Sequence, residues 1–183
     1  GTQVSGGPKT VTVTAGAAAK LVITGDSTQA AGSSKNLTIT AYDALGNVST
    51  SYAGSKSLTF SGANNAPIGT VPTIAATNVG TAVNVTFTNG VATLVASVLY
   101  KVEVAVLATT DGTISAAGAD RLSVRVFNAA ASAARSTLAV ADSVRTGGDS
   151  TTVTVTLKDA YGNPVLDGTA ASFTPNASAG TLR

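Results

Sequence analysis

An internal repeat is the feature of this chain that most limits what it can fold into. Residues 26–47 and 142–163 align without gaps, 116 residues apart, and ten of the 22 paired positions are identical. The identical pairs are Asp26/Asp142, Ser27/Ser143, Gly32/Gly148, Ser34/Ser150, Thr38/Thr154, Thr40/Thr156, Asp43/Asp159, Ala44/Ala160, Gly46/Gly162 and Asn47/Asn163. Self-similarity at one fixed spacing is typical of an array of like structural units.

The segments upstream of each copy follow the same order, and this order predicts the domain boundaries. A strand-like run, an Ala-rich stretch and one basic residue precede each copy: 10–14, 15–19 and Lys20, then 122–126, 128–134 and Arg135. We expect residues 1–14 to be the last strand of a preceding unit, 21–127 to be one complete unit, and 136–183 to be the first half of a following unit. The short Ala-rich linkers between them should limit bending.

Apolar and polar residues alternate with a period of two along most of the chain, which is the pattern of half-buried β-strands. The alternating runs are 10–14, 36–42, 83–88, 102–106, 122–126 and 153–157. Asn89-Gly90, between 83–88 and 91–96, predicts a two-residue β-hairpin. The only helix-tolerant segments are the two Ala-rich linkers. The sequence therefore predicts an all-β fold of antiparallel sandwiches, and 21–127 has nearly the length of an Ig-like domain.

The composition excludes several classes of function. The chain of 183 residues contains no Cys, His, Met or Trp, so thiolate or imidazole metal sites, Cys nucleophiles and His-based catalysis are excluded. Eleven basic and nine acidic residues leave a net charge of +2, which predicts no nucleic-acid partner. The most apolar stretch, 91–108, contains Lys101 and Glu103, so we expect no membrane span. No phosphate loop or nucleophile elbow is present, and we expect neither an enzyme nor a cofactor.

The motif Asp43-x-x-Gly46-Asn47 and its copy Asp159-x-x-Gly162-Asn163 have two interpretations. They could supply calcium ligands, but a calcium site needs about six to eight oxygen atoms. We favour structural turns, in which Asp caps backbone N–H groups, Gly takes a positive φ and Asn tolerates a left-handed conformation. A cation near the linkers, bound by Asp26, Asp120 or Asp142, is a weaker alternative.

Glu103 is the only glutamate of the chain. In an alternating strand it lies on the same side as Lys101 and opposite Val102 and Val104, and we expect that side to face solvent. A Lys–Asn crosslink promoted by a buried acid is therefore not expected here.

The run from Val153 to Val165, VTVTLKDAYGNPV, resembles the early-strand motif of bacterial Ig-like domains of the invasin/intimin type. Residues 38–47 are a second copy, with Val48 where the motif has Pro. Residues 87–93, FTNGVAT, resemble the later hairpin of these domains, and 99–124 is similar to repeats of long bacterial surface proteins. The resemblance implies a β-sandwich rod module of a secreted or surface-anchored protein, used for adhesion or as a spacer. The path of the chain through 61–79, which is long for such a unit, is not predicted.

From these observations we expect a structural or adhesive module of a bacterial cell-surface protein or filament. Its partners would be neighbouring Ig-like domains, met head to tail or laterally, and a host or cell-surface ligand. One route to a filament is strand exchange, in which Thr10, Val11, Thr12, Val13 and Thr14 of one copy complete the half unit of another. The alternative function is a carbohydrate- or receptor-binding module, with Tyr42, Tyr52, Tyr100 and the 61–79 loop as contacts.

Overall fold

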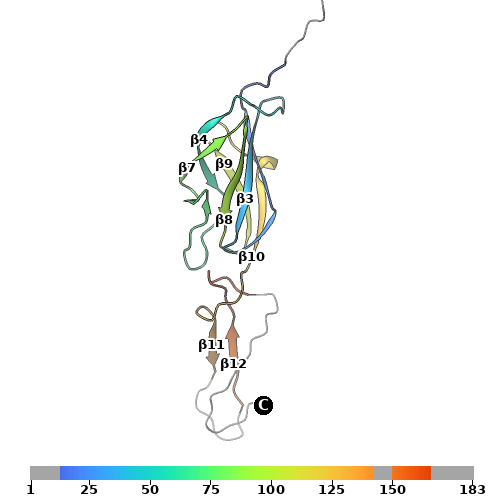
Figure 1. Ribbon diagram of the computed structural model, residues 1–183. Coiled ribbons are helices and arrows are strands. Elements are labelled where there is room, and N and C mark those ends of the chain that lie inside the picture. Colours follow the sequence, from blue (N-terminus) through green and yellow to red (C-terminus); the bar gives the residue numbers. More distant parts are fainter. Residues whose placement is uncertain (1–12, 142–149, 166–183) are drawn as a thin grey trace, which may run out of the picture.

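The structure is a computed structural model that describes residues 13–141 and 150–165 of the chain. These residues form twelve β-strands and one short 3-10 helix, η1 (Gly118–Asp120), and the described part contains no α-helix. The prediction of an all-β sandwich is therefore confirmed. Figure 1 shows a sandwich followed, along the long axis, by a smaller two-stranded sheet. No helix in the described ranges has the length and apolar character needed to cross a membrane.

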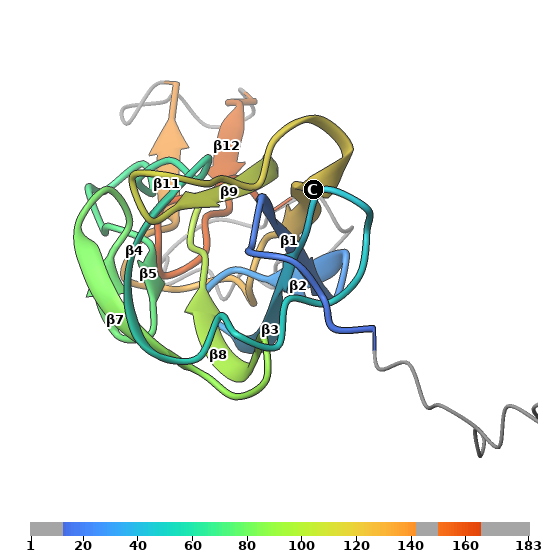
Figure 2. The same ribbon diagram turned by 90° about the horizontal axis from the view of Figure 1, so that it is seen from above.

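The sandwich consists of two five-stranded sheets that face each other (Figures 1 and 2). The first sheet has the order β1 (Lys20–Gly25), β3 (Ser34–Tyr42), β8 (Val91–Val98), β5 (Thr73–Ile74), β6 (Thr77–Asn78). The second has the order β2 (Thr28–Ala30), β10 (Leu122–Phe127), β9 (Val104–Thr110), β4 (Gly54–Ser61), β7 (Ala82–Phe87). All neighbours are antiparallel except β2 and β10, which run parallel.

The core lies between the two sheets and is supplied by the inward-facing residues of the alternating strands. In the first sheet Ile23 pairs with Ile39 across β1 and β3, and both side chains are buried. Phe60 and Phe87 are buried from the second sheet. Burial of such side chains contributes about 1.5–3 kcal/mol each to folding. Every residue of the buried core cluster lies between Leu21 and Val126, so the sandwich carries a core of its own.

The Asn89-Gly90 turn forms as predicted, but the hairpin that it closes is short. Asn89 and Gly90 both have positive φ, as a two-residue turn of this kind requires, and Thr88 and Val91 exchange backbone hydrogen bonds across it. Beyond this bridge the strands separate, because β7 pairs with β4 in one sheet and β8 pairs with β3 in the other. The local sequence determines the turn, whereas the packing of two sheets decides where each strand goes.

The prediction for the 102–106 run is wrong in its faces. Strand β9 begins at Val104, and its inward-facing residues are Ala105 and Leu107, which are buried. Val104 is 62% exposed and Val106 lies on the same outer face. The inward face of β9 is therefore Ala105, Leu107 and Thr109, although the outer face carries two valines, so the packing of the two sheets and not local hydrophobicity decides the register.

The stretch 61–79, whose path was not predicted, crosses the end of the sandwich and then forms the short β5–β6 hairpin. This hairpin extends the first sheet by pairing β5 with β8. The 61–79 stretch thus contributes two short strands to the sandwich.

The chain on either side of the sandwich is described only in part. Val13 and Thr14 form no strand, and Thr10, Val11 and Thr12 lie outside the described residues, so strand exchange stays a prediction. After the sandwich, β11 (Thr137–Val140) pairs with β12 (Val153–Thr156). We call the described residues 128–141 and 150–165 the C-terminal segment.

Candidate functional site

The first copy of the repeated motif forms a tight turn after β3. The Asp43 carboxylate accepts hydrogen bonds from the backbone N–H groups of Leu45 at 3.0 Å and Asn47 at 2.8 Å. The side-chain amide of Asn47 donates to the same carboxylate at 3.1 Å. Gly46 has φ +85°, a conformation that a residue with a Cβ rarely adopts.

The second copy forms the same turn after β12. Asp159 accepts from the N–H groups of Tyr161 and Asn163, both at 2.9 Å, and from the Asn163 side-chain amide at 2.8 Å. Gly162 has φ +82°. The expected left-handed conformation of the two asparagines is wrong: neither Asn47 nor Asn163 has a positive φ. Each asparagine contributes its side-chain amide instead.

Each Asp carboxylate also binds the linker that precedes its turn in the chain. The N–H of Gly16 donates to Asp43 at 2.9 Å, and the N–H of Ala129 donates to Asp159 at 3.0 Å. The hydrogen bond from Gly16, together with those from Asn47, lowers the pKa of Asp43 to about 2. Because the Asp carboxylate of each tight turn accepts a hydrogen bond from a backbone N–H of the linker, the linker is held close to that turn.

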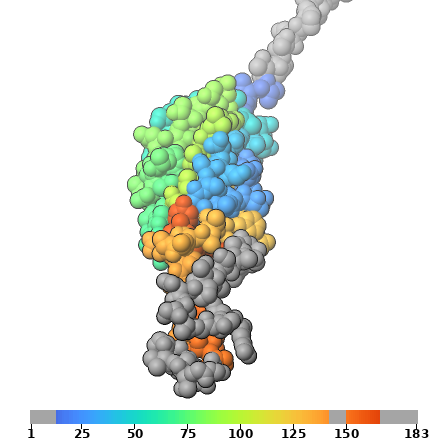
Figure 3. Space-filling model, turned by 60° about the horizontal axis from the view of Figure 1, so that its bottom comes forward, coloured from blue at the N-terminus to red at the C-terminus, as the bar shows by residue number. Residues whose placement is uncertain are grey.

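The two turns differ in their exposure to solvent. The first is at the N-terminal pole of the sandwich, and its residues 44–47 are exposed. The second lies against the opposite pole, where Asn163 is only 1% exposed. In Figure 3 the red atoms at the end of the described chain are set among atoms of the sandwich.

Asn163 joins the second turn to the sandwich. Its side-chain oxygen accepts a hydrogen bond from the N–H of Val102 at 2.9 Å, and its side-chain amide donates to the carbonyl oxygen of Tyr100 at 2.7 Å. With the bond to Asp159, one buried amide connects its own turn with two backbone groups of the preceding strand connection. A buried amide with all of these partners stabilises one particular arrangement of the two parts.

Apolar contacts complete the joint. The ring of Tyr161 packs on the ring of Tyr100, with centroids 4.9 Å apart. The same ring covers Gly32 so closely that a Cβ there would overlap it. Gly162 approaches Ile68 from the 61–79 stretch. We use the name socket for four residues of the sandwich that contact the second turn: Gly32, Ile68, Tyr100 and Val102.

Glu103 lies beside the socket, and its environment corrects the expectation that it faces solvent. Its side chain is only 14% exposed and accepts hydrogen bonds from the N–H and the side-chain amide of Asn64, at 2.8 and 2.7 Å. Lys101 is on the same side, as predicted, with its amine 3.5 Å from the carboxylate. The Lys101 side chain is 40% exposed and forms an ion pair with the Glu103 carboxylate.

The weak calcium candidates lie apart from this joint. Asp26 pairs with Lys35 at 2.8 Å, and Asp120 pairs with Lys20 at 2.9 Å. Asp142 lies outside the described residues. Within the described ranges, no three acidic side chains form a group that could hold a metal ion, and a cation near the linkers stays a prediction.

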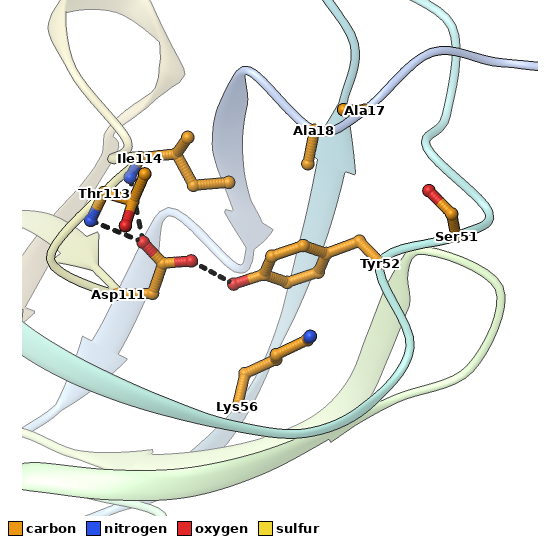
Figure 4. Close-up of a pocket in the computed structure, with 8 residues that line it drawn as sticks. All are labelled: Ala17, Ala18, Ser51, Tyr52, Lys56, Asp111, Thr113 and Ile114. Carbon is orange, nitrogen blue, oxygen red and sulfur yellow. Dashed lines mark hydrogen bonds between the residues drawn. The ribbon is translucent and has the colours of Figure 1, made fainter.

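An open hollow of about 310 Å³ lies at the N-terminal pole (Figure 4). At its centre the Tyr52 hydroxyl donates to Asp111 at 2.7 Å, and the Lys56 amine is 4.7 Å from the centre of the Tyr52 ring. Burial and this hydrogen bond raise the pKa of Tyr52.

Asp111 is held in the hollow by several donors. Burial acts to raise its pKa, but hydrogen bonds from the Ile114 N–H, the Tyr52 hydroxyl and the Thr113 N–H outweigh it, and the pKa is lowered. Since these donors already occupy the carboxylate, the arrangement serves to fix the 111–114 loop to the sandwich.

The tyrosines proposed as carbohydrate or receptor contacts are not brought together. Tyr42 and Tyr52 lie at the N-terminal pole, where Tyr42 ends β3 and Tyr52 lines the hollow. Tyr100 and the 61–79 stretch lie at the opposite pole, within or next to the socket. The described structure therefore offers these side chains no common binding surface.

Sequence reasoning located both turns but not the joint. Gly32 had a signal, because it is one of the glycines shared by the two copies. The hydrogen bonds to the Tyr100 carbonyl and the Val102 N–H had no signal, since a backbone group that pairs with a neighbouring side chain leaves no mark in the residue type. The contacts of the Tyr100 ring and of Ile68 depend on which segment packs against them, which the sequence does not show.

No family model and no curated protein matches this sequence. Among solved structures, the chain is similar to the Escherichia coli adhesin FdeC, with 26% identity and a TM-score of 0.49. The match covers 82% of this chain and 44% of the adhesin chain, so this chain spans less than half of the length of that protein.

Proposed function

We propose that this chain is a structural and adhesive module of a bacterial extracellular surface protein or filament. In it, Ig-like units follow one another head to tail and form a rod. Residues 21–127 are one complete unit, and 136–183 begin the next. The proposal combines the resemblance of the sequence to invasin/intimin-type repeats with the geometry of the joint.

The observation that carries the proposal is that the Asp159–Asn163 turn packs against the C-terminal pole of the sandwich. The turn repeats the hydrogen bonds of the Asp43–Asn47 turn, which supports the interpretation of the two segments as equivalent parts of successive units. Three contacts hold it end-on: the Asn163 amide, the Tyr161 ring and the Gly162 backbone. An end-on joint with a single orientation suits a rod that projects from a cell surface.

The experiment is small-angle X-ray scattering of the purified chain over a concentration series, with sedimentation velocity and negative-stain images of the same samples. We expect an extended particle whose maximum dimension fits an end-on arrangement. Constant mass indicates a projecting spacer, and mass that rises with concentration, with fibres in the images, indicates assembly. A compact particle, in which the C-terminal segment folds back along the sandwich, contradicts the rod.

Adhesion needs a separate measurement. Beads coated with the chain are applied to cultured epithelial cells under flow, and beads coated with the heat-denatured chain serve as the control. We expect retention above the control. Retention equal to the control, with an extended particle in scattering, removes the adhesive part of the proposal and leaves the structural part.

A further inference from the structure

The exposed turn at the N-terminal pole carries the same groups as the turn that is seated in the socket. Leu45 occupies the position of Tyr161 in the repeat, and Asn47 occupies that of Asn163. Tyr161 and Asn163 make the contacts that hold the joint. Leu45 is 88% exposed, and Asn47 is exposed as well. A single exposed leucine is ordinary on a protein surface, but here it coincides with an exposed copy of the joint.

The asparagine is poised in the same way in both turns. Asn47 donates to Asp43, as Asn163 donates to Asp159. Asn163 uses its remaining hydrogen and its oxygen for Tyr100 and Val102. Within the described residues, the Asn47 side chain bonds only to Asp43. Since Asn47 is exposed, its amide could also pair with a backbone N–H and a backbone carbonyl of another unit.

We propose that residues 44–47 are a docking surface for the socket of a preceding Ig-like unit. Leu45 covers the glycine of that socket, as Tyr161 covers Gly32 here. The Asn47 amide bonds to the backbone groups that correspond to Tyr100 and Val102. The partner is thus a unit whose far pole has a glycine without a side chain above it and an unpaired N–H and carbonyl beside it. This inference rests on the proposed function and names the residues of its interface.

The test places a second sandwich ahead of the native one. Residues 13–127 are fused directly to residues 12–183, which keeps the spacing from Phe127 to the next turn equal to that of the native chain. The added copy contains the whole buried core cluster, so it carries what it needs to fold. The chain lacks cysteine, so pairs of introduced cysteines report contacts without a background.

One fusion carries Tyr100→Cys in the added copy and Leu45→Cys in the native copy. A control fusion carries Tyr100→Cys with Leu94→Cys, because Leu94 is 75% exposed on β8, away from the poles. Both are treated with a short bifunctional thiol reagent, and the linked peptide is identified by mass spectrometry. We expect the 100–45 link to form at least tenfold faster than the 100–94 link.

Equal rates for the two pairs, in a fusion that scatters as an extended rod, overturn the docking surface and leave the proposed function intact. A fusion that scatters as a collapsed particle overturns the proposed function itself. A fusion without introduced cysteines, with Asn47→Ala in the native copy, tests the docking surface independently of the cysteine substitutions. We expect this variant to flex between its sandwiches, whereas the same substitution in the original chain leaves its scattering curve unchanged. No change in the fusion contradicts the docking surface.

Discussion

The side-chain amide of Asn163 donates a hydrogen bond to the backbone carbonyl of Tyr100, and the two atoms are 2.7 Å apart. Asn163 belongs to a turn after β12, and Tyr100 follows β8 of the sandwich, so the bond connects segments that share no sheet. A polar side chain that is fully satisfied in a buried place holds a single geometry. The bond therefore holds the turn after β12 in one orientation against the sandwich.

Removal of the Asn163 amide should loosen the joint without unfolding the sandwich. In Asn163→Ala the N–H of Val102 and the carbonyl of Tyr100 lose their partner, at a cost of about 1–3 kcal/mol to the docked arrangement. We expect protease cleavage in 128–136 to become several-fold faster, while the thermal midpoint of the sandwich changes little. The matched control is Asn47→Ala, which removes the same amide from the exposed turn. Equal acceleration in both variants would count against a role of Asn163 in the joint.

Gly32 should tolerate no side chain. Its φ is +76°, and a Cβ would overlap the ring of Tyr161. Gly46→Ala is the control, because Gly46 has a similar φ of +85° and open space around it. We expect Gly46→Ala to cost about 1 kcal/mol of unfolding free energy, and Gly32→Ala to displace Tyr161 in addition. The measurement is urea denaturation together with tyrosine fluorescence. The same fluorescence in Gly32→Ala and the original chain would contradict the contact.

Replacement of Ser97 by alanine should stabilise the sandwich. Its side chain is buried, and its hydroxyl has no hydrogen-bond partner among the described residues. Loss of an unsatisfied buried hydroxyl is expected to raise the unfolding free energy by about 1 kcal/mol. Ser49→Ala is the control, because the equally buried Ser49 hydroxyl donates to the Gly16 carbonyl at 2.7 Å. We expect that substitution to destabilise the sandwich by about 1 kcal/mol. The prediction fails if chemical denaturation gives both variants the same sign.

Acid should release the linker from the first turn. The pKa of Asp43 is about 2 in the folded chain, below its ordinary value of 3.8, because the Gly16 and Asn47 hydrogen bonds favour the carboxylate. The stabilisation is therefore complete above about pH 4 and is lost as the pH falls from 4 to 2. Hydrogen exchange of the Gly16 amide, measured across this range, should lose its protection. In Asp43→Asn this protection should be weak at every pH, and a protected Gly16 amide at pH 2 in the original chain would contradict the assignment.

The alternation of apolar and polar residues determined that the chain is all-β, and the repeated Asp-x-x-Gly-Asn motif determined two equal turns. Both are local properties: side chains alternate along any strand, and the Asp carboxylate reaches the N–H groups of residues in its own turn. The Asn89-Gly90 turn belongs with them, since its conformation depends on two adjacent residues.

Only the tertiary structure decided which contacts these strands and turns make. The faces of β9 followed from which alternate side chains filled the space between the sheets, so Ala105 and Leu107 are buried while Val104 is exposed. The joint followed from backbone groups of Tyr100 and Val102, which any residue type could supply. Two copies of one motif thus acquire different surroundings, one exposed and one buried, because burial depends on the neighbour that packs against each turn.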